Sequence, residues 1–265
     1  MQPYLNLFGL EIPSYAFFIM IGYVAGLLVA LVRHRPAELQ LSDTFFAYIF
    51  AGIGAFLGGK LFFAIQGIPQ FLALREQYGI SFFDYFLAGG LVYYGACIGV
   101  VAMMFLYAKL YKVPAFKIVD TLIVSLPLAQ AFGRVGCFMT GCCYGIPSQT
   151  LGVYFTASEV APHGEPLLPI QLIEAAACLA LFFVMLKMGR KPRKDGHMLG
   201  IYLLGYGIIR FVDEFFRYDA IRGIAAGLST SQWISIIAIA AGIYLLFFFR
   251  KKTQVKNQNP SASNI

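Results

Sequence analysis

The stretch YAFFIMIGYVAGLLVALVR, residues 15–33, decides the fold class, because eighteen uncharged residues precede its single charge, Arg33. A helix needs roughly 20 mainly apolar residues to cross the hydrocarbon core of a bilayer, and this stretch has that length. Further stretches of the same kind lie near residues 44–66, 90–110, 118–138, 170–188, 197–216 and 230–249. The sequence therefore predicts an all-α integral membrane protein, a bundle of seven transmembrane helices.

The composition of the whole chain also favours a bilayer as its solvent. Of the 265 residues, 59% are hydrophobic and 12% are charged, and the mean hydropathy is +0.73. These values exclude an ordinary soluble domain. The net charge of +7 could suggest a nucleic-acid partner. Because the basic residues gather between the apolar stretches, as orientation signals do, we expect membrane lipids and no nucleic acid as partners.

Lysine and arginine residues fall mainly in alternate connections between the predicted spans. Cytoplasmic connections are enriched in these residues, so we expect connections 1–2, 3–4 and 5–6 and the C-terminus in the cytoplasm. With an odd number of spans, the N-terminus is then outside. The basic residues concerned are 14 of the 20 in the chain: Arg33, Arg35, Lys109, Lys112, Lys117, Lys187, Arg190, Lys191, Arg193, Lys194, Arg250, Lys251, Lys252 and Lys256.

The spacing of the spans predicts one transmembrane domain, residues 1–252, followed by a polar tail. Two gaps between spans are long, an arm at about 67–89 and a head at about 139–169, and both fall on the outer side. The head contains a strand-like run, Leu151–Thr156. We expect a small extracytoplasmic head over the bundle and a disordered cytoplasmic tail at residues 253–265.

Small residues recur in the second predicted span, at Gly52, Gly54, Ala55, Gly58 and Gly59. Such residues let helix backbones approach closely within a membrane, so helix packing is the favoured interpretation. A substrate groove with a glycine floor is the alternative.

Charged side chains within the predicted spans share one depth, near the outer face. Each costs about 2.5–3.5 kcal/mol on insertion scales and therefore indicates a functional site. Lys60, Arg134 and Arg210 all fall in the outer parts of spans that run outward, and Arg210 can pair with Glu214 four residues later. Guanidinium groups match phosphate oxygens bidentately, so a phospholipid headgroup is the expected ligand.

Several segments together resemble the prolipoprotein diacylglyceryl transferase family. Members of that family are bacterial enzymes that move diacylglyceryl from phosphatidylglycerol to the lipobox cysteine thiol of a prelipoprotein. The similarity covers nearly all the predicted spans. The segments are FLGGK ending at Lys60, GGLVYYGACIG at Gly89–Gly99, GRVGCFMTGCCYG at Gly133–Gly145, LPIQLIE at Leu168–Glu174, GYGIIRFVDEFFR at Gly205–Arg217 and LSTSQW at Leu228–Trp233.

The resemblance implies roles for individual residues. Arg134 and Arg210 match the family's two essential arginines, which would hold the phosphoglycerol headgroup, and Tyr94 stands where the family has its proposed catalytic histidine. We predict these three as catalytic residues. The predicted substrate-binding residues are Tyr15, Lys60, Gly95, Cys137, Gly141, Cys142, Gln171, Glu174, Tyr206, Glu214 and Arg217.

The sequence also departs from the family pattern at polar positions. Tyr94 replaces the histidine of FHGGLIG, Cys137 and Cys142 replace the asparagine and the acid of GNFINGELWG, and Leu168 replaces the histidine of HPSQ. A phenol of pKa ~10 is a poorer base at neutral pH than an imidazole of pKa ~6.5. The acceptor thiol is a strong nucleophile, a few per cent ionised at pH 7, so a weak base can be enough.

Cys137, Cys142 and Cys143 fall together at the outer end of the fourth predicted span. A disulfide in an oxidising compartment, reactive unpaired thiols and metal ligation remain open as interpretations. The spacing C-x4-C-C lacks supporting histidines, so we predict no metal site and no cofactor.

The residues and the resemblance together predict a function. Phosphatidylglycerol would enter from the outer leaflet of the bacterial inner membrane, and a prelipoprotein thiolate would attack its glyceryl carbon, releasing glycerol phosphate. One alternative is a transferase of the same fold with a different donor or acceptor. Another is a phospholipid-binding membrane protein without chemistry.

Overall fold

A computed structural model describes the chain except residues 1, 8, 192–193, 219–222 and 250–265. The predicted disordered tail at 253–265 therefore lies outside the described residues, as do Arg193 and the basic residues from Arg250 onward. The chain divides into two compact units, one of Met1–Glu38 with Asp120–Lys252 and the other containing Leu39–Val119. The single transmembrane domain stays a prediction.

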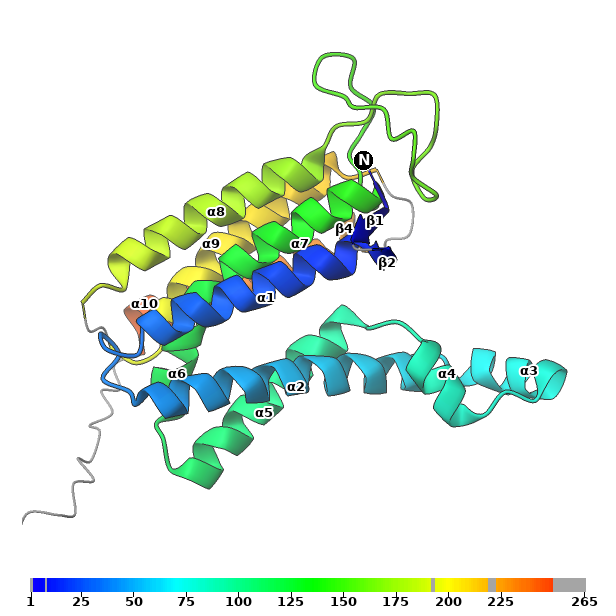
Figure 1. Cartoon of the computed structure of the whole chain (residues 1–265). Coiled ribbons are helices and arrows are strands. Elements are labelled where there is room, and N and C mark those ends of the chain that lie inside the picture. The colour runs from blue at the N-terminus through cyan, green and yellow to red at the C-terminus, as the bar shows by residue number, and fades with distance from the viewer. Residues whose placement is uncertain (1, 8, 192–193, 219–222, 250–265) are drawn as a thin grey trace, which may run out of the picture. The chain divides into compact units, whose positions relative to one another are not determined.

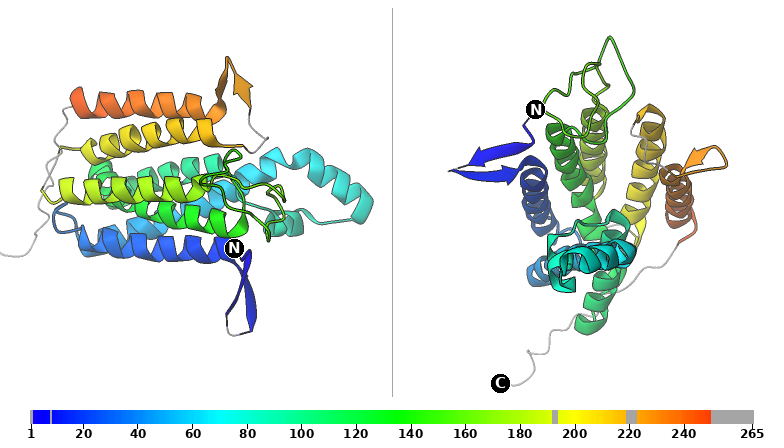
Figure 2. Two further views of the ribbon diagram at one scale, coloured as in Figure 1. Left: turned by 90° about the horizontal axis from the view of Figure 1, so that it is seen from above. Right: turned by 90° about the vertical axis from the view of Figure 1, so that its right-hand side faces the viewer.

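The first unit is a row of helices that follows a short hairpin (Figures 1 and 2). In the hairpin, β1 (Tyr4–Leu7) pairs antiparallel with β2 (Leu10–Pro13). Next to each other in the row, α1 packs on α7, α7 on α8, α8 on α9, and α9 on α10. These helices are α1 (Ser14–Val32), α7 (Leu126–Thr140), α8 (Ile170–Met188), α9 (His197–Asp213) and α10 (Thr230–Phe247).

Short elements connect and extend this row. The helix α6 (Ala115–Leu122), which contains the boundary between the units, leads through the 3-10 turn η1 (Ile123–Ser125) into α7. After α9, the 3-10 turn η2 (Glu214–Phe216) precedes a second small hairpin, β3 (Ile224–Ala225) with β4 (Leu228–Ser229). The buried core between the helices includes Val124, Leu181, Met185, Met198 and Tyr202.

The outer faces of the helices are apolar, as a bilayer requires. Val32 and Ile237, for example, are 76% and 67% exposed. Within the described chain, six helical segments are long and apolar enough to cross a membrane: Ser14–Val32, Leu41–Gln66, Tyr93–Tyr111, Ala115–Thr140, Ile170–Met188 and Thr230–Phe247. The chain is therefore a mostly helical, multi-pass membrane protein, and six of the predicted spans have this property.

The one remaining predicted span, residues 197–216, is the sixth along the chain and forms a shorter helix than expected. The helix α9 has 17 residues and ends at Asp213, and the predicted remainder is the 3-10 turn η2. At 1.5 Å per residue α9 is about 26 Å long, slightly less than a hydrocarbon core of about 30 Å. Its last turn carries two charged residues, Arg210 and Asp213.

The second unit is built on α2 (Leu41–Gln66) and α5 (Tyr93–Tyr111), which pack along each other. Glycines make the contact: a Cβ atom at Gly54 or Gly58 would overlap backbone atoms of Gly99 or Gly95. This geometry supports the helix-packing interpretation of the glycines in the second span. The predicted arm at 67–89 is helical, with α3 (Ile68–Tyr78) and α4 (Phe82–Ala88).

The predicted head lies in the first unit, between α7 and α8, and it is an irregular loop with its own core (Figure 1). Tyr144, Phe155, Ala161 and Leu167 are buried together in it. The expected strand at Leu151–Thr156 is reduced to a single bridge between Val153 and Leu167. A strand cannot extend there because the chain turns on both sides of Val153.

Two buried polar contacts tie helix ends together at the end of the first unit away from the head. Arg33 at the end of α1 donates from one guanidinium nitrogen to the carbonyl oxygen of Gly189, 2.9 Å away, at the end of α8. The carboxylate of Asp120 accepts from the backbone N–H of Leu199, at 2.9 Å, in the first turn of α9. Both contacts satisfy backbone groups that helix ends leave unpaired.

The glycine contact between α2 and α5 generates a stability prediction. We expect Gly58→Ala to lower the melting temperature of the detergent-solubilised protein, because its Cβ would overlap backbone atoms that cannot rotate away. Overpacking of this kind typically costs about 1–3 kcal/mol. Gly90→Ala is the control, since its Cβ would meet only Phe63, at 3.9 Å. Equal melting temperatures for the two variants would contradict this role for Gly58.

Candidate active site

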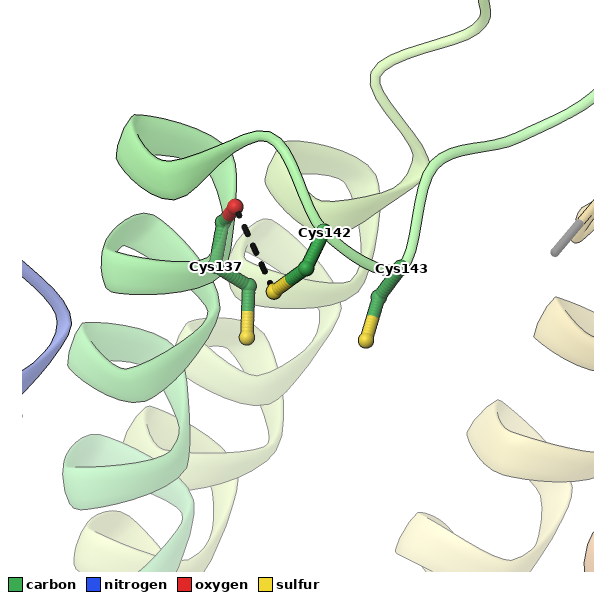
Figure 3. Close-up of side chains that lie close together, drawn as sticks. All are labelled: Cys137, Cys142 and Cys143. Carbon is green, nitrogen blue, oxygen red and sulfur yellow. Dashed lines mark hydrogen bonds between the residues drawn. The ribbon is translucent and has the colours of Figure 1, made fainter. Parts of the chain in front are cut away.

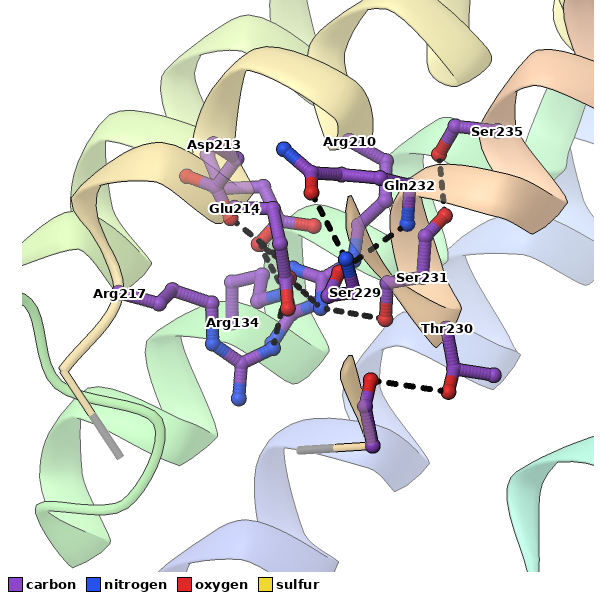
Figure 4. Close-up of polar contacts among 12 residues, drawn as sticks. Arg134, Arg210, Asp213, Glu214, Arg217, Ser229, Thr230, Ser231, Gln232 and Ser235 are labelled. Atoms are coloured by element: carbon purple, nitrogen blue, oxygen red, sulfur yellow. Dashed lines mark hydrogen bonds and ion pairs between the residues drawn. The ribbon is translucent and has the colours of Figure 1, made fainter. Parts of the chain in front are cut away.

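Ionised side chains from three neighbouring elements meet at the head end of the first unit (Figure 4). Arg134 comes from the second half of α7, Glu174 from the first turns of α8, and Arg210 from the end of α9. Glu214 and Arg217 follow in and directly after η2. The order of packing, α7 on α8 and α8 on α9, brings these ends together.

The carboxylate of Glu174 lies between two guanidinium groups. Its Oε2 atom is 2.8 Å from Nε of Arg134 and 3.7 Å from a terminal nitrogen of Arg210. Its other oxygen, Oε1, accepts a hydrogen bond from the Tyr206 hydroxyl at 3.2 Å. Arg134 and Arg210 therefore converge, as the sequence predicted, and Glu174 and Tyr206 belong to the same cluster.

Arg210 contacts further carboxylates on its own segment. One terminal nitrogen lies 3.0 Å from Asp213, and the other lies 2.8 Å from Glu214. The predicted pair of Arg210 with Glu214 is thus present. Arg217 lies 3.9 Å from the same Glu214 carboxylate. The helix ends at Asp213, and the tighter 3-10 turn after it places Glu214 between the two arginines.

The cluster is largely removed from solvent, yet its charges balance. It contains three guanidinium groups and three carboxylates, whose side chains are at most 18% exposed. Buried charges require such pairing, because an isolated one loses its hydration without compensation. Arg134 is the most exposed member and pairs through Nε alone within the described chain, so its terminal nitrogens can donate to a ligand.

Gln171 connects this cluster to the head. Its amide nitrogen donates to the carbonyl oxygen of Cys142 at 2.7 Å. The side chain is buried, and its amide oxygen has no hydrogen-bond partner among the described residues. A buried acceptor without a partner costs free energy. It is therefore a position where a ligand that donates a hydrogen bond would be stabilised.

The start of α10 supports Arg210 from the other side, which the sequence reasoning did not identify. Ser229 caps the helix, its hydroxyl accepts from the N–H of Gln232, and the Gln232 side chain accepts from the N–H of Ser229. Ser231, inside this first turn, lies 3.3 Å from Arg210. The S-x-x-Q spacing is a capping-box signal and could have indicated the helix start.

Three cysteines lie close together at the end of α7 and in the turn that follows it (Figure 3). The sulfur atoms of Cys137, Cys142 and Cys143 are all within 4.8 Å of one another. All five cysteines of the chain are in the described part and none forms a disulfide, so the interpretation of this group as a disulfide is not what the structure shows. Of these three cysteines, Cys143 was not predicted from the sequence as a site residue.

The two cysteines that follow α7 have different acidities. Hydrogen bonds with the thiols of Cys137 and Cys142 lower the pKa of Cys143, burial opposes this, and the nearby Arg217 and Arg134 guanidinium groups lower it further. The pKa of Cys142 is raised, first by its hydrogen bonds with the other two thiols and then by burial. Cys143 is thus the thiol of this pair whose ionised form is stabilised.

Two other predicted residues of the first unit have packing roles at the site. Tyr15 in α1 packs against Gly136 of α7, where an added Cβ would come within 3.2 Å of its backbone. Gly141 ends α7 in the left-handed conformation, with φ of +77°, and a Cβ there would overlap Ser158. The Ser158 hydroxyl donates to the Gly141 carbonyl at 3.1 Å.

The remaining predicted residues belong to the second unit. Lys60 is buried, and its ammonium group donates to the carbonyl oxygens of Phe86, Leu87 and Gly89 at 2.9, 2.8 and 2.5 Å. An ammonium group has three donors, so this arrangement satisfies Lys60 and holds the end of α4. Its role in substrate binding stays a prediction.

Gly95 and Tyr94 lie at the beginning of α5. Gly95 is at the contact with α2, where a side chain would overlap Gly58 and Phe62. Tyr94 is 43% exposed and its ring is edge-to-face with that of Tyr93. The predicted functions of both residues remain predictions.

Comparison with known proteins gives one consistent result. The family model described as prolipoprotein diacylglyceryl transferase matches residues 3–248. A phosphatidylglycerol–prolipoprotein diacylglyceryl transferase of Clostridium tetani is 36% identical over 96% of this chain and 100% of its own length. The enzyme numbered 2 of Clostridium perfringens is 35% identical, covering 91% of this chain and 92% of itself. The enzyme of Chlorobaculum tepidum is 30% identical, covering 93% and 89%.

The position of Glu174 between two arginines generates a second prediction. We expect Glu174→Gln to destabilise the protein by about 3–5 kcal/mol, because it leaves buried guanidinium groups without their shared carboxylate. Thermal unfolding in detergent measures this effect. Glu159→Gln, an exposed change in the head, is the matched control. If both variants unfold at the wild-type temperature, the carboxylate does not hold the cluster together.

Proposed function

The chain belongs to the prolipoprotein diacylglyceryl transferase family, and from that premise we propose that the cluster around Glu174 is the site of its reaction. The reaction moves the diacylglyceryl group of phosphatidylglycerol to the lipobox cysteine thiol of a prelipoprotein and releases glycerol phosphate. One observation carries the assignment to this site. The guanidinium groups of Arg134 and Arg210, 76 positions apart in sequence, share a single carboxylate oxygen.

The bonding capacity of the cluster fits a phosphodiester. Arg134 uses Nε for Glu174, so its two terminal nitrogens can take phosphate oxygens in the bidentate geometry that guanidinium groups favour. The guanidinium groups of Arg210 and Arg217 form ion pairs with carboxylates on the same segment, and these pairs fix their positions. Because the donors are held in place before a ligand arrives, little reorganisation is needed when charge develops on the phosphate.

The chemical step follows from this grip on the phosphate. The acceptor thiolate attacks the glyceryl carbon next to the phosphate ester oxygen, so a C–S bond forms while the C–O bond breaks. The bonding electrons leave with the phosphate, and the thiol proton ends on the released glycerol phosphate. Arginine donors stabilise the departing charge, which is where an enzyme gains most from fixed dipoles and charges.

The acceptor thiol must lose its proton before it attacks. Tyr94 occupies the position of the family's proposed catalytic histidine and would serve as the base. We assign Gln171, Tyr206, Glu214, Arg217, Gly141, Cys137, Cys142 and Tyr15 to binding around the headgroup or the acceptor. Lys60 and Gly95 stay predicted substrate-binding residues. No organic cofactor takes part in this scheme.

We further propose seven spans in a bacterial inner membrane, with α9 and η2 forming the sixth. The N-terminus would be outside and the C-terminus cytoplasmic. The hydrogen bond from Arg33 to Gly189 supports this orientation, because it joins two connections rich in basic residues. Gly189 is 15 residues, or about 22 Å, along α8 from Glu174. The site would then lie near the outer headgroups, where phosphatidylglycerol can enter sideways.

Two other functions are compatible with the same site. The tyrosine at position 94 would suit a transferase of this family with a different donor or acceptor. A protein that only binds phospholipid would use the arginines without turnover. Lipid analysis of a deletion strain separates the first case, and phosphatidylglycerol-dependent thermal stabilisation without product indicates the second.

The proposed binding of the phosphate by Arg134 and Arg210 generates a kinetic prediction. We expect Arg134→Lys and Arg210→Lys to lower product formation about 10²–10³-fold, because lysine loses the bidentate geometry for the phosphate. The assay uses the reconstituted protein, labelled phosphatidylglycerol and a lipobox peptide, and it detects the thioether product. Arg75→Lys, in the exposed part of α3, is the control. Absence of product from the wild-type protein, where a histidine-bearing relative gives product, would refute the proposed reaction.

Position 94 generates a separate prediction. If the phenol takes the acceptor proton, Tyr94→Phe lowers turnover at pH 7 and Tyr94→His restores it, since imidazole is the better base at that pH. The same peptide assay, with pH varied from 6 to 9, measures both variants. Full activity of Tyr94→Phe across that range would exclude Tyr94 as the base.

A further inference from the structure

The cysteine cluster at the end of α7 is defined by Cys137, Cys142 and Cys143. The phosphate binding proposed for Arg134 and Arg210 does not require it. Their three sulfur atoms lie within 4.8 Å of one another, and none is in a disulfide. Cys137 is buried, while Cys142 and Cys143 are partly accessible. Figure 3 shows the three sulfur atoms gathered beneath the turn that follows α7.

The backbone around the cluster is fixed in an uncommon conformation. The N–H of Cys142 donates to the carbonyl oxygen of Cys137 at 3.1 Å, which folds the chain back over the helix end. Cys143 has φ of +58°, a left-handed value that few residues other than glycine adopt. The bond from Gln171 to the Cys142 carbonyl holds this turn from α8. Several contacts thus maintain a costly geometry that brings the thiols together.

Three thiolates at this separation match the chemistry of a thiophilic metal ion. Zinc binds thiolate at about 2.3 Å in tetrahedral geometry, which places sulfur atoms about 3.8 Å apart. Small side-chain rotations would bring the three sulfur atoms, now within 4.8 Å of one another, to this spacing. Structural zinc sites have four protein ligands, whereas sites with three leave a position for a reacting molecule.

We propose that Cys137, Cys142 and Cys143 bind Zn²⁺ as three thiolates, and that the thiol of the acceptor cysteine binds as the fourth ligand. This inference rests on the proposed function, since it assigns the cluster to the acceptor of the same reaction. It differs from the expectation from sequence that the chain has no metal site. The C-x4-C-C spacing needs no histidine for this site. The left-handed turn at Gly141 brings Cys142 and Cys143 close to Cys137, and the acceptor thiol would be the fourth ligand.

The charges around the cluster fit this arrangement. A zinc ion with three thiolates carries one net negative charge, and a fourth thiolate makes it two. Arg134 and Arg217 both lie near enough to Cys143 to interact with its charge. Arg134 also pairs with Glu174, so the residue that would grip the phosphate adjoins the site that would hold the thiol.

The metal would supply acceptor activation without a strong base. Binding to zinc replaces a water molecule and releases the thiol proton, since a coordinating thiol is deprotonated. The bound thiolate attacks the glyceryl carbon, the C–S bond forms and the C–O bond breaks. The glycerol phosphate leaves with the electron pair and takes up a proton. The thioether product is a neutral, weak ligand and leaves the zinc.

The test measures metal binding apart from catalysis. The full-length protein is purified in detergent with a reductant, stripped with a chelator and titrated with Zn²⁺ and, separately, with Co²⁺. We expect one ion per chain, and for Co²⁺ the charge-transfer and visible bands of a tetrahedral thiolate site. Cys142→Ser and Cys143→Ser should lose these bands and the stoichiometric zinc. Cys97→Ser and Cys178→Ser, which change cysteines outside the cluster, should keep both.

A second readout tests the fourth ligand. Addition of a lipobox peptide should shift the visible spectrum of the Co²⁺ form, and the same peptide with serine at the acceptor position should not. Because this measurement uses the wild-type protein, it does not depend on the folding of any variant.

Particular outcomes separate this inference from the proposed function. Failure of the reduced wild-type protein to bind either ion, or a disulfide within the cluster in active protein, would overturn the zinc site and leave the transferase assignment intact. Unchanged binding in the Cys142→Ser and Cys143→Ser variants would also overturn it. Zinc binding with no product from phosphatidylglycerol would refute the transferase assignment and, with it, the role given to the fourth ligand.

Discussion

The carboxylate of Glu174 is the contact on which the site depends, because it holds two guanidinium groups within reach of one oxygen atom. Without it, Arg134 on α7 and Arg210 on α9 would repel each other in surroundings that solvent barely reaches. The helix α8 lies between the other two, and Glu174 is in its first turns. The helices pack in the order α7, α8 and α9, and their charged groups follow the same order: guanidinium, carboxylate, guanidinium.

The two units of the chain use glycine and charge in different ways. In the second unit, glycines allow α2 and α5 to approach at the backbone, and the buried Lys60 is satisfied by carbonyl oxygens. In the first unit, charges are concentrated at one end and matched in number, three guanidinium groups to three carboxylates. The ammonium group of Lys60 uses its three donors on carbonyl oxygens, whereas an arginine with donors left over is suited to an anion.

The proposed zinc site would add a second kind of chemistry beside the arginines. In this family's reaction one partner is an anionic leaving group and the other is a thiol, and the two demand different surroundings. Guanidinium groups serve the first, while soft thiolate ligands around a metal ion serve the second. Arg134 borders both groups, through its pair with Glu174 and its proximity to Cys143. The zinc proposal therefore places both substrates at one end of α7.

The sequence by itself determined the membrane fold, because helices of this length and apolarity have no other stable surroundings. The positions of Arg134 and Arg210 within their predicted spans already indicated that both residues lie at one depth. It also determined family membership, through segments such as GYGIIRFVDEFFR. Only the tertiary structure showed that Glu174 lies between the arginines, that Lys60 is satisfied by carbonyl oxygens, and that Ser231 supports Arg210. Helical periodicity gives the face of a residue but not the neighbouring helix, and the left-handed turn that gathers the cysteines depends on contacts from α8 and the head.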